Sequence, residues 1–182
     1  MPVVAYQGEP GAFSDVAART FIVDADTRGY ESFDEVVDAV VSGAADYGVL
    51  PIENSIVGPI AASGELLRTT AAVRVCEELR LPIDMCVIGP PGSTLATITE
   101  IRSLPVALEQ VQAFIARHGW RRVAAHDTAG AVREVIDLGD ASIAAIGPAL
   151  AAERYGGKIL ACGIQDQQNN STRFVLIARS SN

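Results

Sequence analysis

The feature that most constrains the fold is the alternation of two kinds of segment along the chain. Short apolar runs rich in valine and isoleucine are separated by alanine-rich segments whose apolar residues recur with the period of a helix. Strands buried on both faces of a sheet give such apolar runs, and crossover helices connect them when the strands are parallel. The pattern predicts an α/β fold with a mostly parallel sheet.

Local turn and capping residues place the ends of the predicted elements. Ser32 is predicted to cap a helix that Gly43 ends, and Pro82 is predicted to break one long apolar stretch into two strands. The predicted strands span residues 3–6, 27–31, 47–52, 73–88 with that break, 122–125, 142–146, 159–163 and 172–178. The predicted helices span residues 12–21, 33–42, 59–67, 105–117, 129–136 and 148–155.

Length and charge narrow the classes of function. A chain of 182 residues, of which 49% are hydrophobic, can bury a sizeable core as one compact unit or as two small lobes. Its formal net charge of -8 has the wrong sign for a surface that neutralises nucleic-acid phosphates or anionic lipids. We therefore expect a small-molecule substrate and neither a nucleic-acid nor a membrane partner.

The cysteines and the N-terminus bear on location. Cys76, Cys86 and Cys162 form no Cys-x-x-Cys pair, and none has a histidine at a metal-ligand spacing. No apolar run approaches the roughly 20 residues of a membrane helix, and Met1 leads directly into the first predicted strand. These features predict reduced cysteines, no metal or cofactor, and a cytoplasmic chain without a leader segment.

A dense run of hydrogen-bonding side chains, within residues 165–174, leads into the last predicted strand. By composition alone such a run is more often a solvated loop than a functional site. Its end, however, resembles the Asn-x-Thr-Arg-Phe signature of prephenate dehydratases, and further segments resemble that family in the same order. The matching segments are 8–14 (GEPGAFS), 46–58 (DYGVLPIENSIVG), 127–129 (DTA), 144–152 (AAIGPALAA), 164–166 (IQD) and 170–174 (NSTRF).

The resemblance implies a fold, a reaction and an organisation. The implied fold has two α/β lobes with a cleft between them, similar to the type II periplasmic-binding-protein-like fold. The lobes are expected at about residues 1–75 plus 164–182 and about residues 76–163. The implied reaction converts prephenate to phenylpyruvate in phenylalanine biosynthesis without a cofactor, and a homodimer is possible. Because the chain ends soon after its last predicted strand, we expect no ACT-type regulatory domain.

The resemblance also places the catalytic role on Thr172. Hydroxide is a poor leaving group, so the site must give the leaving oxygen a proton or a strong hydrogen bond. A threonine hydroxyl donates hydrogen bonds but is not a ready acid. We expect Thr172 to orient and hydrogen-bond the leaving hydroxyl, with the proton relayed through it or through a water molecule.

The two carboxylates of prephenate need hydrogen-bond donors. Asn54 and Ser55 follow a predicted strand and precede a predicted helix start at residues 58–59. Thr128 and Ala129 open another predicted helix. Helix N-termini attract anions, so these four residues are predicted to bind the substrate.

Arg173 and Phe174 complete the predicted substrate-binding set through the family motif. Successive side chains of a strand point to opposite faces. If Thr172 faces the substrate, Arg173 faces away and pairs with an acid, and the alternative is that Arg173 binds a carboxylate itself. Glu53 is the candidate partner of Arg173, and its alternative role is that of a proton donor.

The sequence leaves open alternative roles for the histidines, alternative substrates and an alternative class of function. His126, at a strand end, is a candidate proton shuttle or a surface residue, and His118 fits a helix C-terminal cap. Residues 103–107 read Ser-Leu-Pro-Val-Ala where the family commonly has Ser-His-Pro-Gln-Ala, so Leu104 and Val106 leave arogenate or a prephenate analogue as alternative substrates. A non-catalytic module that binds small anions is the alternative from another class.

Overall fold

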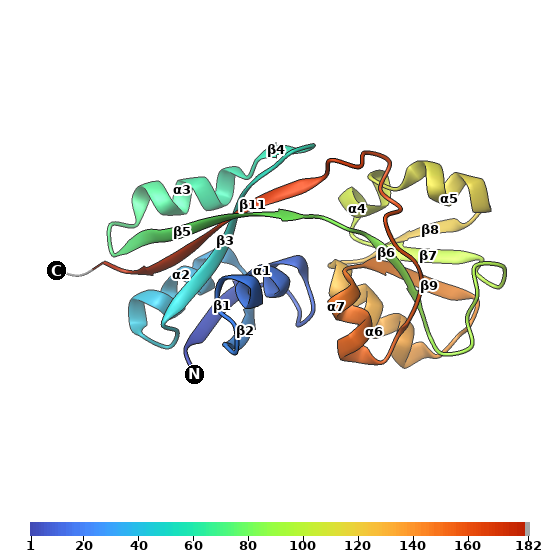
Figure 1. Cartoon of the computed structure of the whole chain (residues 1–182), viewed down its shortest axis with the longest axis horizontal. Coiled ribbons are helices and arrows are strands. Elements are labelled where there is room, and N and C mark those ends of the chain that lie inside the picture. The colour runs from blue at the N-terminus through green and yellow to red at the C-terminus, as the bar shows by residue number, and fades with distance from the viewer. Residues whose placement is uncertain (181–182) are drawn as a thin grey trace. The chain divides into compact units, whose positions relative to one another are not determined.

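The computed structural model describes residues 1–180 and divides them into two compact units, each with its own sheet and helices (Figure 1). The first unit contains Met1–Glu9, Phe13–Ile83 and the described residues from Asn169 onward. The second unit contains Pro10–Ala12 and Asp84–Gln168. The predicted α/β fold class is confirmed. The prediction of a mostly parallel sheet is wrong, because both sheets contain antiparallel as well as parallel strand pairs. The chain passes between the units at four points.

The sheet of the first unit is mixed, and its strand order is β2-β1-β3-β11-β5. β1 (Val3–Gln7) pairs in parallel with β2 (Asp26–Tyr30) and with β3 (Tyr47–Asn54). β11 (Ser171–Arg179) lies antiparallel between β3 and β5 (Val73–Pro82). The last strand of the chain is therefore inserted into the sheet that the first strand begins.

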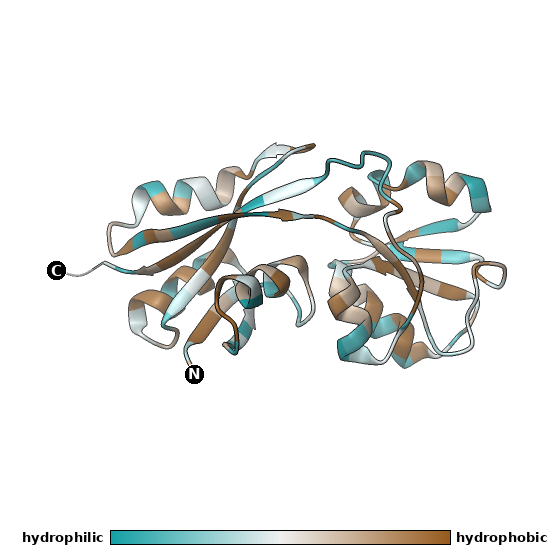
Figure 2. Cartoon of the chain, in the orientation of Figure 1, coloured by the Kyte–Doolittle hydropathy of each residue, from teal (hydrophilic) through white to brown (hydrophobic). Residues whose placement is uncertain are grey.

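Three helices pack on this sheet: α1 (Phe13–Phe21), α2 (Phe33–Ser42) and α3 (Ala61–Thr69). Val4 and Tyr6 belong to an apolar cluster with residues of α1, whereas Ala5 belongs to a second cluster with residues of α2 and α3. This division follows the period-two alternation of a strand that is buried on both faces. In Figure 2, β11 is brown over most of its length, as expected for a central strand.

Capping residues set the ends of α2 as predicted. The Ser32 hydroxyl accepts a hydrogen bond from the backbone N–H of Glu35 at 3.2 Å, which satisfies one of the unpaired N–H groups of the first turn. Gly43 ends the helix in the left-handed conformation, with φ 81°. No helix among the described residues is both long enough and apolar enough to cross a bilayer.

The sheet of the second unit has the strand order β10-β6-β9-β7-β8. β6 is antiparallel to β9 and β10, and β7 is parallel to β8 and β9. The strands are β6 (Cys86–Gly89), β7 (Glu100–Ser103), β8 (Arg121–Ala124), β9 (Ile143–Gly147) and β10 (Lys158–Ala161). The helices are α4 (Pro105–Glu109), α5 (Gln112–His118), α6 (Thr128–Leu138) and α7 (Ala149–Tyr155).

Part of the loop after β1 packs within the second unit. Gly11 has φ 92°, and a Cβ atom on Gly11 would lie 2.9 Å from the Cα atom of Ala151 in α7. The Tyr155 hydroxyl donates a hydrogen bond to the backbone oxygen of Pro10 at 2.6 Å. Glycine is required at residue 11 because only glycine tolerates both this close approach and this backbone conformation.

Two predicted helices differ from the observed ones. The helix predicted over residues 105–117 is observed as two helices, α4 and α5, and the carboxylate of Asp166 accepts a hydrogen bond from Ala113 N at 3.1 Å in the first turn of α5. The helix predicted from residue 59 begins at Ala61. Gly58–Pro59 instead forms a short strand, β4, that pairs with β3.

Strand β7 was absent from the prediction because it carries charged residues. Glu100 is buried, and its carboxylate forms ion pairs with Arg102, at 2.6 Å, and with Arg121. A buried acid is tolerated when it is paired in this way. Hydropathy alone therefore hides a strand whose charge is neutralised by side chains from its own strand and from β8.

The boundaries between the units lie later in the chain than the predicted boundaries near residues 75 and 163. β5 stays paired with β11 as far as Pro82, and Ile83 N donates to Asn170 O at 2.9 Å. On the other side, Gln165 accepts a hydrogen bond from Met85 N at 3.1 Å and so belongs to the second unit. Long-range pairing, which the local pattern does not contain, sets both boundaries.

The prediction of reduced cysteines is wrong for two of the three. Cys86 and Cys162 form a disulfide within the second unit, and Cys76 is free. The antiparallel register of β6 and β10 pairs Ala161 with Val87, and this brings the next residue, Cys162, beside Cys86. The two cysteines are 76 residues apart, so their spacing in the sequence does not reveal the pair.

A glycine in β3 lets α2 pack closely on the sheet. A Cβ atom on Gly48 would lie 3.0 Å from side-chain atoms of Val36, Val40 and Ile177. We expect Gly48→Ala to lower the free energy of unfolding by about 1–3 kcal/mol, because overpacking forces these neighbours apart. In the control Gly64→Ala, where a Cβ atom meets nothing within 4 Å, we expect a gain of roughly 0.5–1 kcal/mol. Urea denaturation followed by circular dichroism measures both, and equal effects would contradict this account.

Candidate active site

Two strands of the first unit bring predicted site residues together. β3 ends at Asn54, β11 begins at Ser171, and their antiparallel pairing places Thr172 opposite Asn54. Because β3 is parallel to β1, the pair lies at the edge of the sheet where these strands have their carboxyl ends. Ligands of α/β sheets usually bind at that edge. The hydrophilic segment that leads into β11, teal in Figure 2, ends at this point.

The side chain of Asn54 is held from both ends. Its Oδ1 atom accepts hydrogen bonds from Ile56 N at 2.9 Å and from Val57 N at 3.0 Å. Backbone N–H groups can pair only with the oxygen, so the amide nitrogen must face the other way. Nδ2 donates to Asn170 Oδ1 at 2.9 Å and to Thr172 Oγ1 at 3.0 Å. Asn54 therefore links the turn after β3 to the start of β11.

The hydroxyl group of Thr172 is placed as a hydrogen-bond donor. Thr172 is buried, with 7% of its surface exposed, and Oγ1 accepts the hydrogen bond from Asn54. A hydroxyl has one hydrogen to donate and two lone pairs that accept. Among the described residues, none accepts a hydrogen bond from Thr172 Oγ1. Its hydrogen is therefore left for another acceptor.

Ser55 holds the segment before Thr172. Its backbone N–H donates to Ser171 O at 2.9 Å, and its hydroxyl accepts from Ser171 N at 2.9 Å. The same hydroxyl donates to Asn169 O at 2.9 Å. The Ser55 side chain is thus occupied by protein partners, and its role in this geometry is to fix residues 169–171.

Asn170 belongs to the same cluster, although the sequence-based prediction assigned it no role. Its Oδ1 atom accepts from Asn54, and its backbone oxygen accepts from Ile83 N. Asn170 is buried, with 2% of its surface exposed. The signal that could have found it is the first position of the Asn-x-Thr-Arg-Phe match.

Arg173 forms ion pairs on its own sheet. Its guanidinium group lies 3.0 Å from the Glu78 carboxylate on β5 and 3.5 Å from the Glu53 carboxylate on β3. These pairs join the two strands that flank β11. Of the two roles considered for Glu53, the structure supports the ion pair with Arg173. All three groups are partly exposed, so each pair contributes about 0–1 kcal/mol.

Two residues of the predicted binding set lie in apolar cores. Phe174 is 2% exposed and packs in the cluster that contains Tyr6, Val49 and Leu176. Ala129 is fully buried in the apolar cluster of the second unit. Their side chains contribute to packing, and the backbone of Phe174 lies in β11, which is paired on both sides.

In the second unit, Thr128 and Ala129 form the first turn of α6. Asp127 is the N-cap, and its carboxylate accepts a hydrogen bond from Gly130 N at 2.6 Å. The N–H groups of Thr128 and Ala129 belong to the part of the helix that has no intrahelical acceptor and that carries the positive end of the helix dipole. This turn has the chemistry of an anion-binding site.

His118 and Ser103 make contacts within the fold, whereas His126 lies on the surface. His118 Nδ1 lies 2.9 Å from Phe114 O at the end of α5, and Gly119 follows in the left-handed conformation, as expected for a C-terminal cap. His126 is exposed. In the segment 103–107, the hydroxyl of Ser103 donates to Ile146 O at 2.7 Å, so that residue holds β7 against β9.

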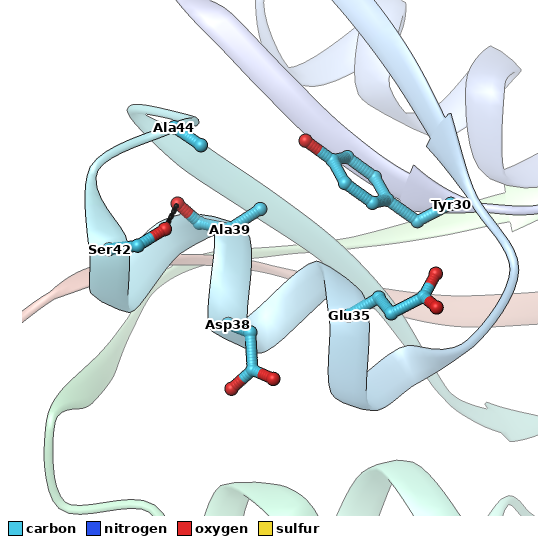
Figure 3. A pocket seen from close by; sticks show the side chains of 6 residues that line it. All are labelled: Tyr30, Glu35, Asp38, Ala39, Ser42 and Ala44. Atoms are coloured by element: carbon cyan, nitrogen blue, oxygen red, sulfur yellow. Dashed lines mark hydrogen bonds between the residues drawn. The ribbon is translucent and has the colours of Figure 1, made fainter.

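A shallow depression of about 370 Å³ lies elsewhere in the first unit (Figure 3). It is lined by Tyr30, Glu35, Asp38, Ala39, Ser42 and Ala44, and so by two carboxylates and by no cationic side chain. A dianionic ligand is repelled from such a surface. None of the residues predicted to bind substrate lines it.

The fold and the strand-end cluster define a class: an α/β protein of two units with a hydroxyl and amide site at the edge of a sheet. Comparison with known proteins then identifies the family, because the family model described as prephenate dehydratase matches residues 4–182. The chain belongs to the prephenate dehydratase family. The resemblance inferred from the short motifs is confirmed.

Similar proteins have more than one named activity. "Arogenate dehydratase/prephenate dehydratase 1, chloroplastic" from Arabidopsis thaliana is 38% identical over 176 residues, which cover 97% of this chain and 45% of that protein. The solved structure of GqqA, "a novel type of quorum quenching acylases", superposes with a TM-score of 0.92 at 36% identity and covers 99% of this chain and 65% of that one. The prephenate dehydratase from Arthrobacter aurescens in complex with L-Phe gives 0.89 at 26% identity, with 99% and 61% covered.

The chain spans about half the length of the curated relatives it matches, for example 45% and 42% of two of them. The similarity therefore concerns one part of those proteins.

Removal of the Asn54 side chain tests whether it organises the site. We expect Asn54→Ala to lower the free energy of unfolding of the first unit by about 1–3 kcal/mol, because buried donors and acceptors lose their partner. The control is Asn169→Ala, at an exposed residue of the segment that leads into β11, for which we expect a change within about 0.5 kcal/mol. Chemical denaturation measures both variants, and an Asn54→Ala protein as stable as its parent would show that the amide does not hold the two strands.

Proposed function

We propose that this chain converts prephenate to phenylpyruvate by coupled decarboxylation and dehydration, with Thr172 hydrogen-bonding the leaving hydroxyl. Membership of the prephenate dehydratase family supports the reaction. The observation that carries the role of Thr172 is the 3.0 Å hydrogen bond from Asn54 Nδ2 to Thr172 Oγ1. Because that bond occupies a lone pair of Oγ1, the hydroxyl hydrogen is directed to a different acceptor, and the proposal makes the leaving oxygen that acceptor.

The chemistry explains why a donor is needed. The electron pair of the breaking bond to the ring carboxylate moves into the ring as carbon dioxide leaves, and the bond to the ring hydroxyl breaks as the ring becomes aromatic. Negative charge therefore develops on the leaving oxygen, and a positioned donor typically accelerates such a step by about 10²–10⁴. Threonine is not a ready acid, so the proton that completes the water molecule comes from beyond Thr172, through its hydroxyl or through solvent.

In this proposal Asn54 and Ser55 position the reacting group. The polar atoms of both side chains are used by protein partners, so these residues hold Thr172 in place. The carboxylates of the substrate are assigned instead to donors without an intramolecular partner. The backbone N–H groups of Thr128 and Ala129 suit this role because they begin α6.

Arg173 and Phe174 act through the strand that carries Thr172. The ion pairs of Arg173 with Glu53 and Glu78 tie β11 to its neighbours, and the ring of Phe174 anchors the same strand in the core. Alternation along the strand then presents Thr172 on the side away from Arg173. This arrangement favours the role of Arg173 as a residue that holds the strand over direct contact with a carboxylate.

Arogenate is the second candidate substrate. A relative from Arabidopsis thaliana has both activities in its name. In addition, this chain has the apolar residues Leu104 and Val106 where the family commonly has histidine and glutamine. Measurement of kcat/KM with each substrate, by phenylpyruvate absorbance for prephenate and by phenylalanine release for arogenate, decides between them. We expect the higher value with prephenate, and a higher value with arogenate would reverse the assignment.

We further propose that the protein is cytoplasmic and that it forms a homodimer. The family resemblance supports both, and the net charge of -8 is consistent with a soluble surface. Multi-angle light scattering across a range of protein concentrations tests the oligomeric state. A constant mass equal to one chain of 19.1 kDa would exclude the homodimer.

Substitution of Thr172 tests the mechanism directly. We expect Thr172→Ala to lower kcat by about 10²–10⁴, because the donor to the leaving oxygen is lost. Thr172→Ser is the matched control, since it keeps the hydroxyl, and we expect it to retain most of the activity. Circular dichroism and urea denaturation verify that both variants fold. Equal turnover by Thr172→Ala and the parent would remove the hydroxyl from the mechanism.

A binding protein would behave differently from an enzyme in the same assays. Isothermal titration calorimetry of the parent with prephenate measures affinity, and absorbance at the same concentrations measures turnover. We expect turnover. Tight binding without turnover would support a small-anion binding module in place of the dehydratase.

A further inference from the structure

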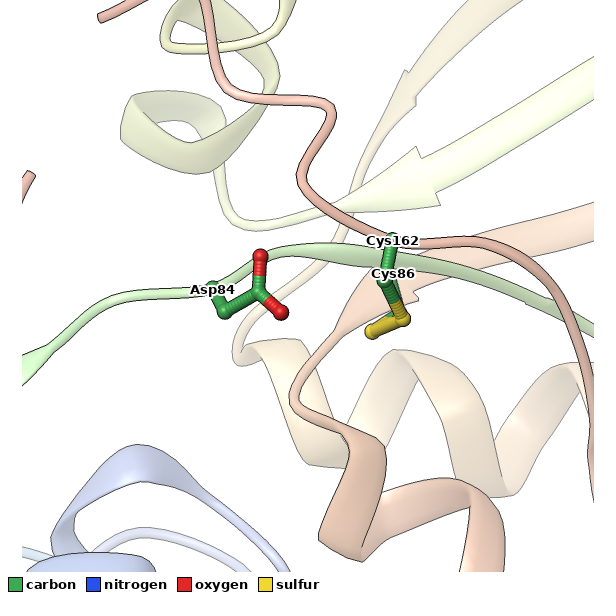
Figure 4. Close-up of side chains that lie close together, drawn as sticks. All are labelled: Asp84, Cys86 and Cys162. Carbon is green, nitrogen blue, oxygen red and sulfur yellow. A yellow bond between two sulfur atoms is a disulfide. The ribbon is translucent and has the colours of Figure 1, made fainter. Parts of the chain in front are cut away.

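The disulfide joins the two segments through which the second unit continues into the first. Cys86 begins β6, shortly after the chain enters the second unit at Asp84. Cys162 follows β10 and precedes residues 163–168, with which the chain leaves that unit. The next residues, 169–172, are those that Asn54 and Ser55 hold at the candidate active site. Figure 4 shows the sulfur atoms of both cysteines together, with Asp84 nearby in the link that leads into β6.

Few other bonds fasten residues 163–168 to residues 84–86. Elsewhere in the second unit, Asp166 N donates to Gln110 O at 2.8 Å, and the Asp166 carboxylate accepts from Ala113 N. The Gln165 side chain accepts from Met85 N at 3.1 Å and donates to Asp84 Oδ1 at 3.4 Å. Ile164 N lies 3.4 Å from Met85 O, at the long end of the hydrogen-bonding range. The disulfide is the covalent connection in this set. Its removal therefore weakens the attachment of the segment without cutting into the sheet.

The two sulfur atoms differ in access. Cys86 is fully buried in the apolar cluster of the second unit, whereas Cys162 is exposed. Exchange with a thiol requires that a thiolate reach one sulfur of the disulfide, so it proceeds at Cys162. Exposed disulfides are the ones most open to such exchange.

We propose that Cys86 and Cys162 form a reversible thiol–disulfide switch whose reduction loosens the attachment of residues 163–168 to residues 84–86. A dithiol reduces it in two steps. Its first thiolate attacks Cys162 Sγ, the sulfur–sulfur bond breaks, and Cys86 leaves with the electron pair and takes up a proton. The second thiol of the reagent then displaces Cys162, which is also protonated, and the reagent closes to a cyclic disulfide. The protein gains two electrons and two protons.

Reduction frees Cys162 to move because it removes the covalent bond that ties this residue to Cys86. Cys86 is confined by the core, so Cys162 is the residue that moves outward. Residues 163–168 follow it, since they continue the chain from Cys162.

This movement connects the switch to catalysis, and that part rests on the proposed function. The oxidised protein holds the segment that continues into Asn170 and Thr172. The reduced protein must restrain it on binding substrate, which costs conformational entropy. We expect kcat/KM for prephenate to be about five- to tenfold lower in the reduced protein.

Asp84 modulates the exchange. Its carboxylate oxygen lies within 4.8 Å of both sulfur atoms, so its charge repels an incoming thiolate. Asp84→Asn removes the charge and keeps an oxygen that accepts the Gln165 hydrogen bond. We expect this variant to be reduced about two- to fourfold faster by glutathione at low salt, with a smaller difference at high salt.

The test uses the full chain with Cys76→Ser, which leaves the pair as its only cysteines. The native protein is treated in turn with oxidised glutathione, with dithiothreitol and with an oxidant. After each treatment the reagent is removed, and thiols are counted with a colorimetric reagent after denaturation, because Cys86 is buried. We expect zero, two and zero. Amide hydrogen exchange, measured in the same samples, is expected to be at least about tenfold faster in residues 163–168 on reduction and unchanged in β1 and β3.

Three outcomes overturn the switch: two thiols after oxidised glutathione, zero thiols after dithiothreitol in the folded protein, or unchanged exchange in residues 163–168. The variant Cys76→Ser/Cys162→Ser serves as a permanently reduced reference, and its exchange must match that of the reduced parent. Turnover is measured last. If neither redox state turns over prephenate, the dehydratase assignment fails, while thiol counts and amide exchange still decide the switch.

Discussion

The antiparallel pairing of β3 with β11 is the interaction on which the rest of the candidate site depends. It joins Asn54 to residues more than a hundred positions later, and the side-chain amide of Asn54 fixes both sides of the junction. The oxygen end orders the turn at Ile56, and the nitrogen end orders Thr172. The planar amide of Asn54 therefore holds the ends of β3 and β11 together and orients the hydroxyl of Thr172.

The two faces of β11 make different kinds of contact. On the side of Thr172 the contacts are short hydrogen bonds to a largely buried hydroxyl, where a lost partner is costly. On the side of Arg173 the contacts are partly exposed ion pairs, which stabilise weakly but bridge three strands. Precision in placing the hydroxyl thus comes from the partly buried amide of Asn54, while the charges restrain the strand as a whole.

The sequence predicted most of the fold because most elements have a local cause. Neighbouring residues in the sequence determine the N-cap of α2 at Ser32, the end of α2 at Gly43 and the end of β5 at Pro82. The failures have distant causes. β7 contains the charged residue Glu100, which is neutralised by Arg121 from the neighbouring strand, and the first turn of α5 is bonded to the distant residue Asp166. The disulfide depends on the register of β6 and β10, which no local pattern contains.

The candidate site also depends on contacts between distant residues, which the local sequence does not reveal. Asn54 was expected to bind a carboxylate because it follows a strand, but its polar atoms are used by Asn170, Thr172 and the turn at residues 56–57. Local chemistry suggests an available amide, and only the pairing of distant strands shows that it is engaged. The motif matches around residues 54 and 170–172 are therefore not two separate indications of function. They describe one hydrogen-bonded junction from its two sides, so a change at either side removes the direction that the other gives to Thr172.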